Sequence, residues 1–92
     1  MELTELRARI DEIDAALIEL LEQRMDVAAG VADYKIAHGL PVLDASREKE
    51  KYAAIRAKCR PETADGIESI FAAALAASRA YQQARMEASH AE

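Results

Sequence analysis

The sequence has few of the residues that build β-sheets, disulfides and metal sites. Its 92 residues include no Trp, one Phe, three Tyr, three Gly, two Pro, two His and one Cys. A sheet protein of this size would need more turn-forming residues and more β-branched or aromatic ones, so an all-β fold is excluded. The single cysteine, Cys59, excludes an internal disulfide and a zinc site built from cysteines. Two histidines are too few for a convincing metal site, and we expect no bound metal.

Long apolar runs and surplus positive charge are also missing. No apolar run is as long as the roughly 18 residues of a membrane-spanning helix, and the first residues lack the basic and then apolar segments of a signal peptide. The formal net charge is −5 and aromatic residues make up 4% of the chain, which argues against a phosphate-binding surface and a base-stacking platform. We expect a cytoplasmic protein that binds neither nucleic acid nor a membrane.

Alanine dominates the composition. It supplies 21 residues, whereas Val, Ile and Thr together supply 12. Alanine loses no side-chain entropy in a helix, while β-branched residues lose some, so this balance favours helix strongly. A chain of 92 residues is also too short for two independent cores. The composition therefore predicts a single all-α domain over residues 1–92.

Apolar spacing and helix-breaking residues divide the chain into three helices, one long, one short and one long. The expected ranges are residues 4–37, 45–58 and 61–86. Gly39 suits the position just after a helix, and Pro41 cannot continue one. Asp44 is a typical N-cap for the second helix, and Pro61 fits the first turn of the third.

The first helix is too long for a compact monomer. Its apolar residues recur every three or four positions, as a helix-packing surface requires, at Leu3, Leu6, Ile10, Ile13, Leu17, Leu20 and Leu21. About 34 residues at about 1.5 Å each give a rod of about 50 Å. A compact chain of this length has a radius of gyration of only about 12 Å. This mismatch predicts that the apolar stripe packs against a second chain in a homodimer.

Two positive charges occupy positions where the same stripe should be apolar. Arg24 and Lys35 are 11 residues apart, about 20° beyond three full turns, so they share one helix face. Unpaired cations in a helical interior are unfavourable. Either they reach the surface or pair with Asp44 or Glu48, or they face an anionic ligand, and the pattern alone leaves both interpretations open.

The other polar candidates are weaker signals. Arg7 lies 17 residues before Arg24, which turns it by about 100° on the same helix. It is either a surface residue or, in a dimer with crossing helices, a residue that reaches the partner's pocket. Ser78 and Gln82 are four residues apart and share a face with the apolar stripe of the third helix.

The ordered set of these residues is more specific than any one of them. The chain carries, in this order, Leu6-Arg7-x-x-Ile10, Ile13-Asp14, Gln23-Arg24, Lys35, Pro41-Val42-x-Asp44-x-x-Arg47-Glu48 and Ser78-x-x-x-Gln82. The set resembles the all-helical class of chorismate mutase, the short monofunctional type, over about residues 4 to 85. The resemblance implies a homodimer of three-helix chains whose long first helices cross and intertwine, with two sites buried among the helices.

The resemblance also implies a role for each candidate residue toward the substrate chorismate. Arg24, together with Arg7 of the partner subunit, would clamp the two carboxylates. Lys35 and Gln82 would donate hydrogen bonds to the ether oxygen of the breaking bond, and Ser78 would lie beside the ring carboxylate.

Three residues of the second helix and its cap would complete the site. Glu48 would accept a hydrogen bond from the ring hydroxyl, aided by backbone groups near Asp44. Arg47 would orient Glu48 and contact a carboxylate. In this interpretation the catalytic residues are Lys35 and Gln82 together with Arg24 and Glu48.

The expected reaction is the Claisen rearrangement of chorismate to prephenate, in the biosynthesis of phenylalanine and tyrosine. It is unimolecular, so it requires no nucleophile, metal or redox cofactor, and we expect no cofactor. Catalysis would come from holding the compact conformer and stabilising negative charge on the ether oxygen. Arg suits bidentate contacts to carboxylates, and Lys supplies a compact charge for the ether oxygen.

Three alternatives stay open. An isochorismate–pyruvate lyase would share the fold and the cationic clamp, but Glu48 favours the mutase because we expect no carboxylate at that position in a lyase. A 4-amino-4-deoxychorismate mutase would also fit. A non-catalytic helical dimerisation module predicts apolar residues or Asn where the chain has Arg24 and Lys35.

Overall fold

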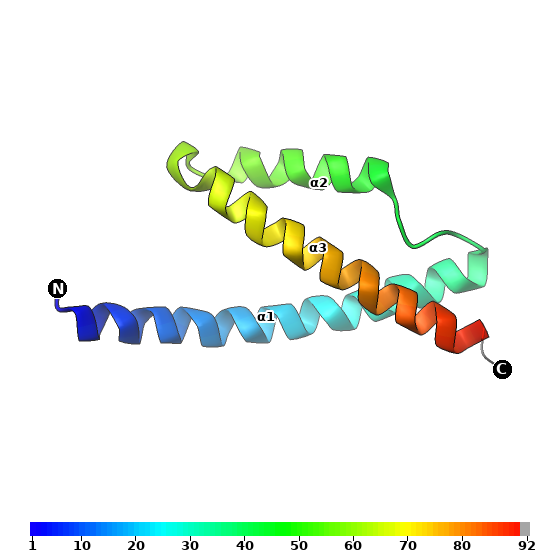
Figure 1. Cartoon of the computed structure of the whole chain (residues 1–92), viewed down its shortest axis with the longest axis horizontal. Coiled ribbons are helices and arrows are strands. Elements are labelled where there is room, and N and C mark those ends of the chain that lie inside the picture. Colours follow the sequence, from blue (N-terminus) through cyan, green and yellow to red (C-terminus); the bar gives the residue numbers. More distant parts are fainter. Residues whose placement is uncertain (91–92) are drawn as a thin grey trace.

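A computed structural model describes residues 1–90 and contains three α-helices. They are α1, Leu3–His38, α2, Ala45–Lys58, and α3, Pro61–His90 (Figure 1). The all-α prediction is confirmed. The structure differs from the expected ranges mainly at the end of α3, which continues four residues beyond Met86. The added residues Glu87 and Ala88 have high helix propensity, and the Gln83 amide donates to the Glu87 carboxylate across one turn at 3.3 Å.

The break between α1 and α2 follows from two local interactions. Gly39 adopts a left-handed conformation with φ 65°, and its N–H points back to the carbonyl of Ile36. The next N–H, that of Leu40, donates to the carbonyl of Lys35 at 2.9 Å, so α1 ends in a tight C-terminal cap. Asp44 Oδ1 accepts a hydrogen bond from the N–H of Arg47 at 3.0 Å and begins α2.

Helix α3 holds the chain together. It crosses the C-terminal part of α1 and packs against α2 (Figure 1). No Cα atom of α1 lies within 8 Å of a Cα atom of α2. The buried apolar residues are few and mostly small: Ala28, Ala32, Ile55, Ala64 and Leu75. Small side chains on α1 let the α3 backbone come close, because little side-chain volume separates the two helices.

Two arginine clusters join the helices at the surface. Arg56 of α2 donates to Asp65 at 2.9 Å and also to Glu68, both on α3. Arg85 of α3 donates to both oxygens of Asp33 on α1 at 2.9 Å. These hydrogen bonds, to Asp65 and to Asp33 respectively, raise the pKa of the two guanidinium groups above the ordinary value. Because the pairs are exposed to solvent, they orient the helices more than they stabilise them.

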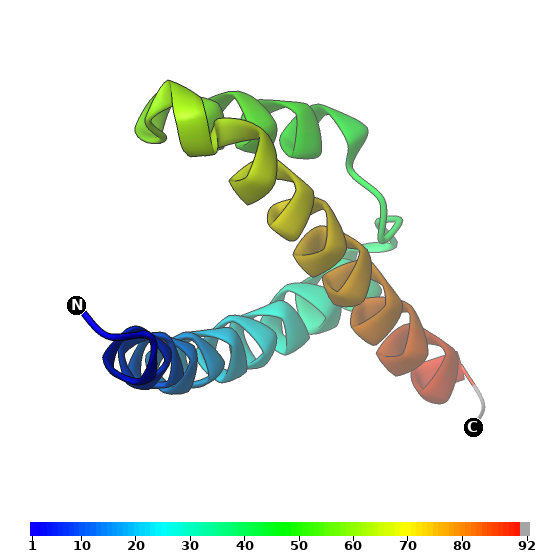
Figure 2. The same ribbon diagram turned by 60° about the vertical axis from the view of Figure 1, so that its left-hand side comes forward.

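The N-terminal half of α1 projects away from the other helices (Figure 2). Its large apolar side chains are 41–61% exposed, at Leu3, Leu6, Ile10, Ile13, Leu17, Ile18, Leu20 and Leu21. The chain measures 56 × 26 × 14 Å and has a radius of gyration of 16.5 Å, against about 12 Å for a compact chain of this length. Despite this apolar surface, none of the helices within residues 1–90 has the length and apolar character needed to cross a membrane.

Candidate active site

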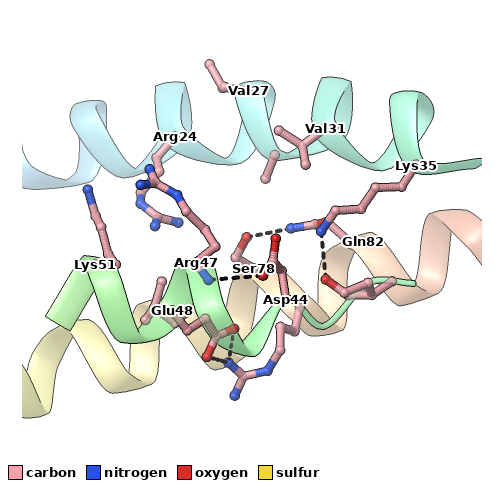
Figure 3. Close-up of a pocket in the computed structure, with 14 residues that line it drawn as sticks. Arg24, Val27, Val31, Lys35, Asp44, Arg47, Glu48, Lys51, Ser78 and Gln82 are labelled. Carbon is pink, nitrogen blue, oxygen red and sulfur yellow. Dashed lines mark hydrogen bonds and ion pairs between the residues drawn. The ribbon is translucent and has the colours of Figure 1, made fainter. Parts of the chain in front are cut away.

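The three helices and the loop before α2 enclose a cavity of about 300 Å³ (Figure 3). Seven of the eight predicted site residues line it: Arg24, Lys35, Asp44, Arg47, Glu48, Ser78 and Gln82. The volume lies at the lower end of the range, roughly 300–1,000 Å³, of pockets for small molecules. Residues spread over more than fifty positions of the sequence therefore meet at one place.

Arg7 is the predicted site residue that lies outside the cavity. It is exposed on the projecting half of α1, 17 residues from Arg24. At about 1.5 Å per residue this separation is about 25 Å along the helix, far beyond the length of an arginine side chain. Arg7 therefore cannot serve the cavity of its own chain.

The face of α1 that lines the cavity carries a cation at each end and apolar residues between them. Arg24 and Lys35 extend from α1 toward α2 and α3 (Figure 3), and Val31 also lines the cavity. Ala28 lies between them and is buried against α3. The spacing of three and four residues places all four on one face, as the helical period requires.

Arg24 and Lys35 do not form the ion pairs that one interpretation of the sequence suggested. Within residues 1–90, the guanidinium of Arg24 has no hydrogen-bond or ion-pair partner, and neither Asp44 nor Glu48 contacts it. The side chain is nevertheless half-buried. An arginine that faces a cavity with its donors unsatisfied is well suited to bind a carboxylate, which accepts two parallel N–H bonds.

A chain of hydrogen bonds joins Lys35, Gln82 and Ser78 at one end of the cavity. Lys35 Nζ donates to the carbonyl of Val42 at 2.6 Å and to Gln82 Oε1 at 3.2 Å. Gln82 Nε2 in turn donates to Ser78 Oγ at 3.1 Å. An ammonium has three N–H groups and an amide NH2 has two, so Lys35 and Gln82 each keep one donor for an oxygen in the cavity. Gln82 and Ser78 are buried, which fixes the direction of these donors.

Glu48 is held by an arginine that the sequence analysis did not single out. Arg79 Nη1 donates to Glu48 Oε1 at 2.5 Å and to Oε2 at 2.6 Å. Arg47 was expected to orient Glu48, but among the described residues its side chain makes no hydrogen bond to that carboxylate, and the position is taken by Arg79. The available signal was the place of Arg79 directly after Ser78 on α3, which puts it beside the Ser78 and Gln82 face.

Lys51 is, after Arg79, the second charged cavity residue that was not predicted from the sequence. It lies one turn after Arg47 on α2, on the same side of the helix (Figure 3). Two acidic side chains thus face five cationic ones in the cavity wall, Arg24, Lys35, Arg47, Lys51 and Arg79. This local excess of positive charge, in a chain whose net charge is −5, suits a small ligand with two negative charges.

Several known proteins are similar to this chain. A chorismate mutase from Methanocaldococcus jannaschii is 40% identical over 63 residues, which are 68% of this chain and 64% of that protein. The T-protein of Enterobacter agglomerans is 42% identical over 55 residues, 60% of this chain and 15% of that protein. A 4-amino-4-deoxychorismate mutase from Streptomyces venezuelae is 37% identical over 46 residues, 50% of this chain and 45% of that protein. No solved structure gives a significant match.

The matched part is less than two thirds of the length of each of these relatives. The family described as chorismate mutase type II matches residues 6–83, which include all of α2, most of α1 and α3, and all eight predicted site residues. The resemblance found in the sequence is confirmed by this match. The chain belongs to the chorismate mutase type II family.

Proposed function

We propose that this chain is a chorismate mutase, which rearranges chorismate to prephenate. The observation that carries the proposal is the arrangement of the cavity, where the donors Lys35 and Gln82 lie at one end, cations lie on both the α1 and the α2 walls, and the Glu48 carboxylate lies on α2. This arrangement matches a substrate with an ether oxygen, two carboxylates and a ring hydroxyl. Phenylalanine and tyrosine biosynthesis is the proposed context.

The cations account for binding and for the conformation of the substrate. Arg24 lies on α1 and Arg47 on α2, on opposite walls of the cavity (Figure 3). Carboxylates held by both walls bring the two arms of the substrate toward each other, which is the geometry that the new carbon–carbon bond requires. Such positioning lowers the barrier because the entropy of alignment is lost on binding rather than in the chemical step.

The donors account for stabilisation of the transition state. As the carbon–oxygen bond breaks, negative charge develops on the ether oxygen. The remaining N–H groups of Lys35 and Gln82 are directed by their bonds to Val42 and Ser78, so they need little reorganisation as the charge forms. Donors fixed in this way stabilise the transition state more than the ground state.

The proposed active species is a homodimer in which Arg7 of the partner subunit completes each cavity. The exposed apolar stripe of α1 and the large radius of gyration support a second chain along this helix. Arg7 lies on the projecting half, too far from its own cavity but able to reach that of a chain packed against the stripe. The proposed compartment is the cytoplasm, with which one free cysteine, Cys59, is compatible.

A 4-amino-4-deoxychorismate mutase is the second candidate. It is favoured by similarity to proteins of that name from Streptomyces venezuelae and Streptomyces pristinaespiralis, at 37% and 35% identity over about half of this chain. The two candidates differ in the group on the ring that would face Glu48, a hydroxyl in one substrate and an amine in the other.

The test of the proposal is an assay of the purified chain with chorismate, isochorismate and 4-amino-4-deoxychorismate in parallel. Each reaction is monitored by the loss of substrate absorbance. We expect chorismate to be consumed fastest. We expect Lys35→Ala to lower kcat by a factor of about 100 or more with a smaller change in KM, because its contact strengthens as the bond breaks. Lys49→Ala removes an exposed lysine of α2 outside the cavity and should change neither constant. A chain that leaves chorismate unchanged contradicts the proposal.

A further inference from the structure

Arg79 is a cavity residue to which the proposed mechanism gives no role. Its guanidinium lies across Glu48, and one terminal nitrogen contacts both carboxylate oxygens, at 2.5 and 2.6 Å. Dashed lines at Glu48 in Figure 3 mark this pair. The Glu48 side chain is 22% exposed and that of Arg79 is 36% exposed, so solvent screens the pair only in part. Arg79 is therefore the direct partner of the Glu48 carboxylate in the cavity wall.

The pair changes what Glu48 offers to a ligand. An arginine keeps its proton throughout the physiological pH range, so Glu48 and Arg79 together carry no net charge. A carboxylate has about four lone-pair sites, and Arg79 occupies two of them. Glu48 can still accept a hydrogen bond from a neutral donor such as a hydroxyl, but it does not present an uncompensated negative charge.

The charge balance is different when the ligand carries an amine at the position that faces Glu48. Aliphatic amines are largely protonated near neutral pH, so the group enters as an ammonium. The carboxylate that would balance this ammonium is already neutralised by Arg79, and Arg47 and Lys51 add positive charge to the same wall. Like charges brought together in a partly desolvated site are costly, and such repulsion is a common source of specificity.

We propose that Arg79 is a specificity-determining residue that favours a hydroxyl over an ammonium at the ring position facing Glu48. The inference rests on the proposed function and selects chorismate over 4-amino-4-deoxychorismate among the candidate substrates. Arg79 does this by balancing the charge of the carboxylate that faces the ring.

The test measures kcat/KM for both substrates and takes their ratio, amine over hydroxyl. Arg79→Gln removes the charge and keeps a hydrogen-bond donor beside Glu48, so we expect the ratio to rise about tenfold or more. Arg79→Lys keeps the charge and should leave the ratio close to that of the unchanged chain. The matched control is Arg85→Gln, which removes a second α3 arginine and its ion pair with Asp33 outside this cavity. It should not change the ratio.

Each outcome decides the inference. If Arg79 only supports the fold, Arg79→Gln lowers kcat/KM for both substrates alike, and the constant ratio overturns the inference while leaving the proposed function in place. An unchanged chain that prefers the amine also overturns the inference alone, since mutase chemistry persists. An unchanged chain that converts neither compound overturns the proposed function and the inference with it.

Discussion

Lys35 is the residue at which three parts of the site converge. Its ammonium belongs to α1, donates to the loop carbonyl of Val42 and donates to the amide of Gln82 on α3. A substitution of Gln82 therefore removes the amide donor of Gln82 and also changes the orientation of the Lys35 ammonium. The two residues form one unit, and we expect substitutions of them to be non-additive.

We expect Gln82→Glu to make the activity depend on acid pH. An ionised carboxylate at this position pairs with Lys35, offers no donor and repels the charge that develops on the ether oxygen, so activity near pH 7 should fall about 100-fold. The neutral acid regains a donor. Burial and a bound dianion raise the pKa of the new carboxyl, while Lys35 lowers it, and protonation restores activity as the pH falls.

The measurement is a profile of kcat/KM against pH for this variant and for Gln83→Glu, which places the same group on the exposed neighbouring residue. The control should keep the profile of the unchanged chain. A flat profile for Gln82→Glu between about pH 5 and about pH 8 would show that Gln82 does not donate to the reacting oxygen.

At the same scale, single residues were predictable where one helix sufficed to place them. Arg24 and Lys35 could be identified because a charge in an apolar stripe is visible from the helical period alone. Arg79 could not, since its role depends on the angle at which α3 packs along α2, and that angle brings it to Glu48 from 31 positions away. The helical period does not specify a crossing angle.

The crossing of α1 and α3 is the element that positions the cavity. Ala32 is 0% exposed at this contact, and Ala28 is buried one turn earlier. With so little side-chain volume between the helices, Lys35 of α1 is held within hydrogen-bond distance of Gln82, at 3.2 Å.

We expect Ala32→Leu to force the two helices apart and to destabilise the fold by about 1–3 kcal/mol. Leucine has nearly the helix propensity of alanine, so the effect would come from packing. Thermal unfolding followed by circular dichroism measures it, with Ala37→Leu, at an exposed position of α1, as the control. An unchanged melting temperature for Ala32→Leu would mean that the contact is looser than the structure shows.

Helix limits were predictable where a residue enforces them. Gly39, Pro41 and Asp44 determine the end of α1 and the beginning of α2, and the structure has both limits within one residue of the expected ones. The end of α3 was misplaced because no glycine or proline follows Met86. Where only propensity acts, a helix ends gradually, and the sequence gives no sharp limit.

The shape of the whole molecule bears on how the site is completed. The chain is 56 Å long, and the half of α1 that carries Arg7 has no intrachain partner among the described residues. Its length and apolar stripe predict a second chain, but the way in which two chains cross depends on both of their surfaces together. The roles of Arg7 and Arg24 can be distinguished by experiment, because in the proposed dimer the two residues of one cavity come from different chains.

We expect Arg7→Ala and Arg24→Ala homodimers to be nearly inactive on their own and to regain activity when mixed. Unfolding and refolding an equal mixture gives about half heterodimers if pairing is random, and one of the two sites in each carries neither substitution. About one site in four should then recover full activity. If Arg7 served its own chain, every site would carry one substitution and the mixture would show no gain. Sizing of the refolded product confirms that the chains exchanged.

In the proposed dimer, the exposed apolar half of α1 makes the folded state of this molecule depend on protein concentration. In the proposed dimer that half of the helix is covered only by association, so dilution would expose it and weaken the folded state by mass action. The same dilution would withdraw Arg7 from each cavity. Stability and activity would then decline together over one range of concentration, and a separated chain would be neither a stable protein nor a working enzyme.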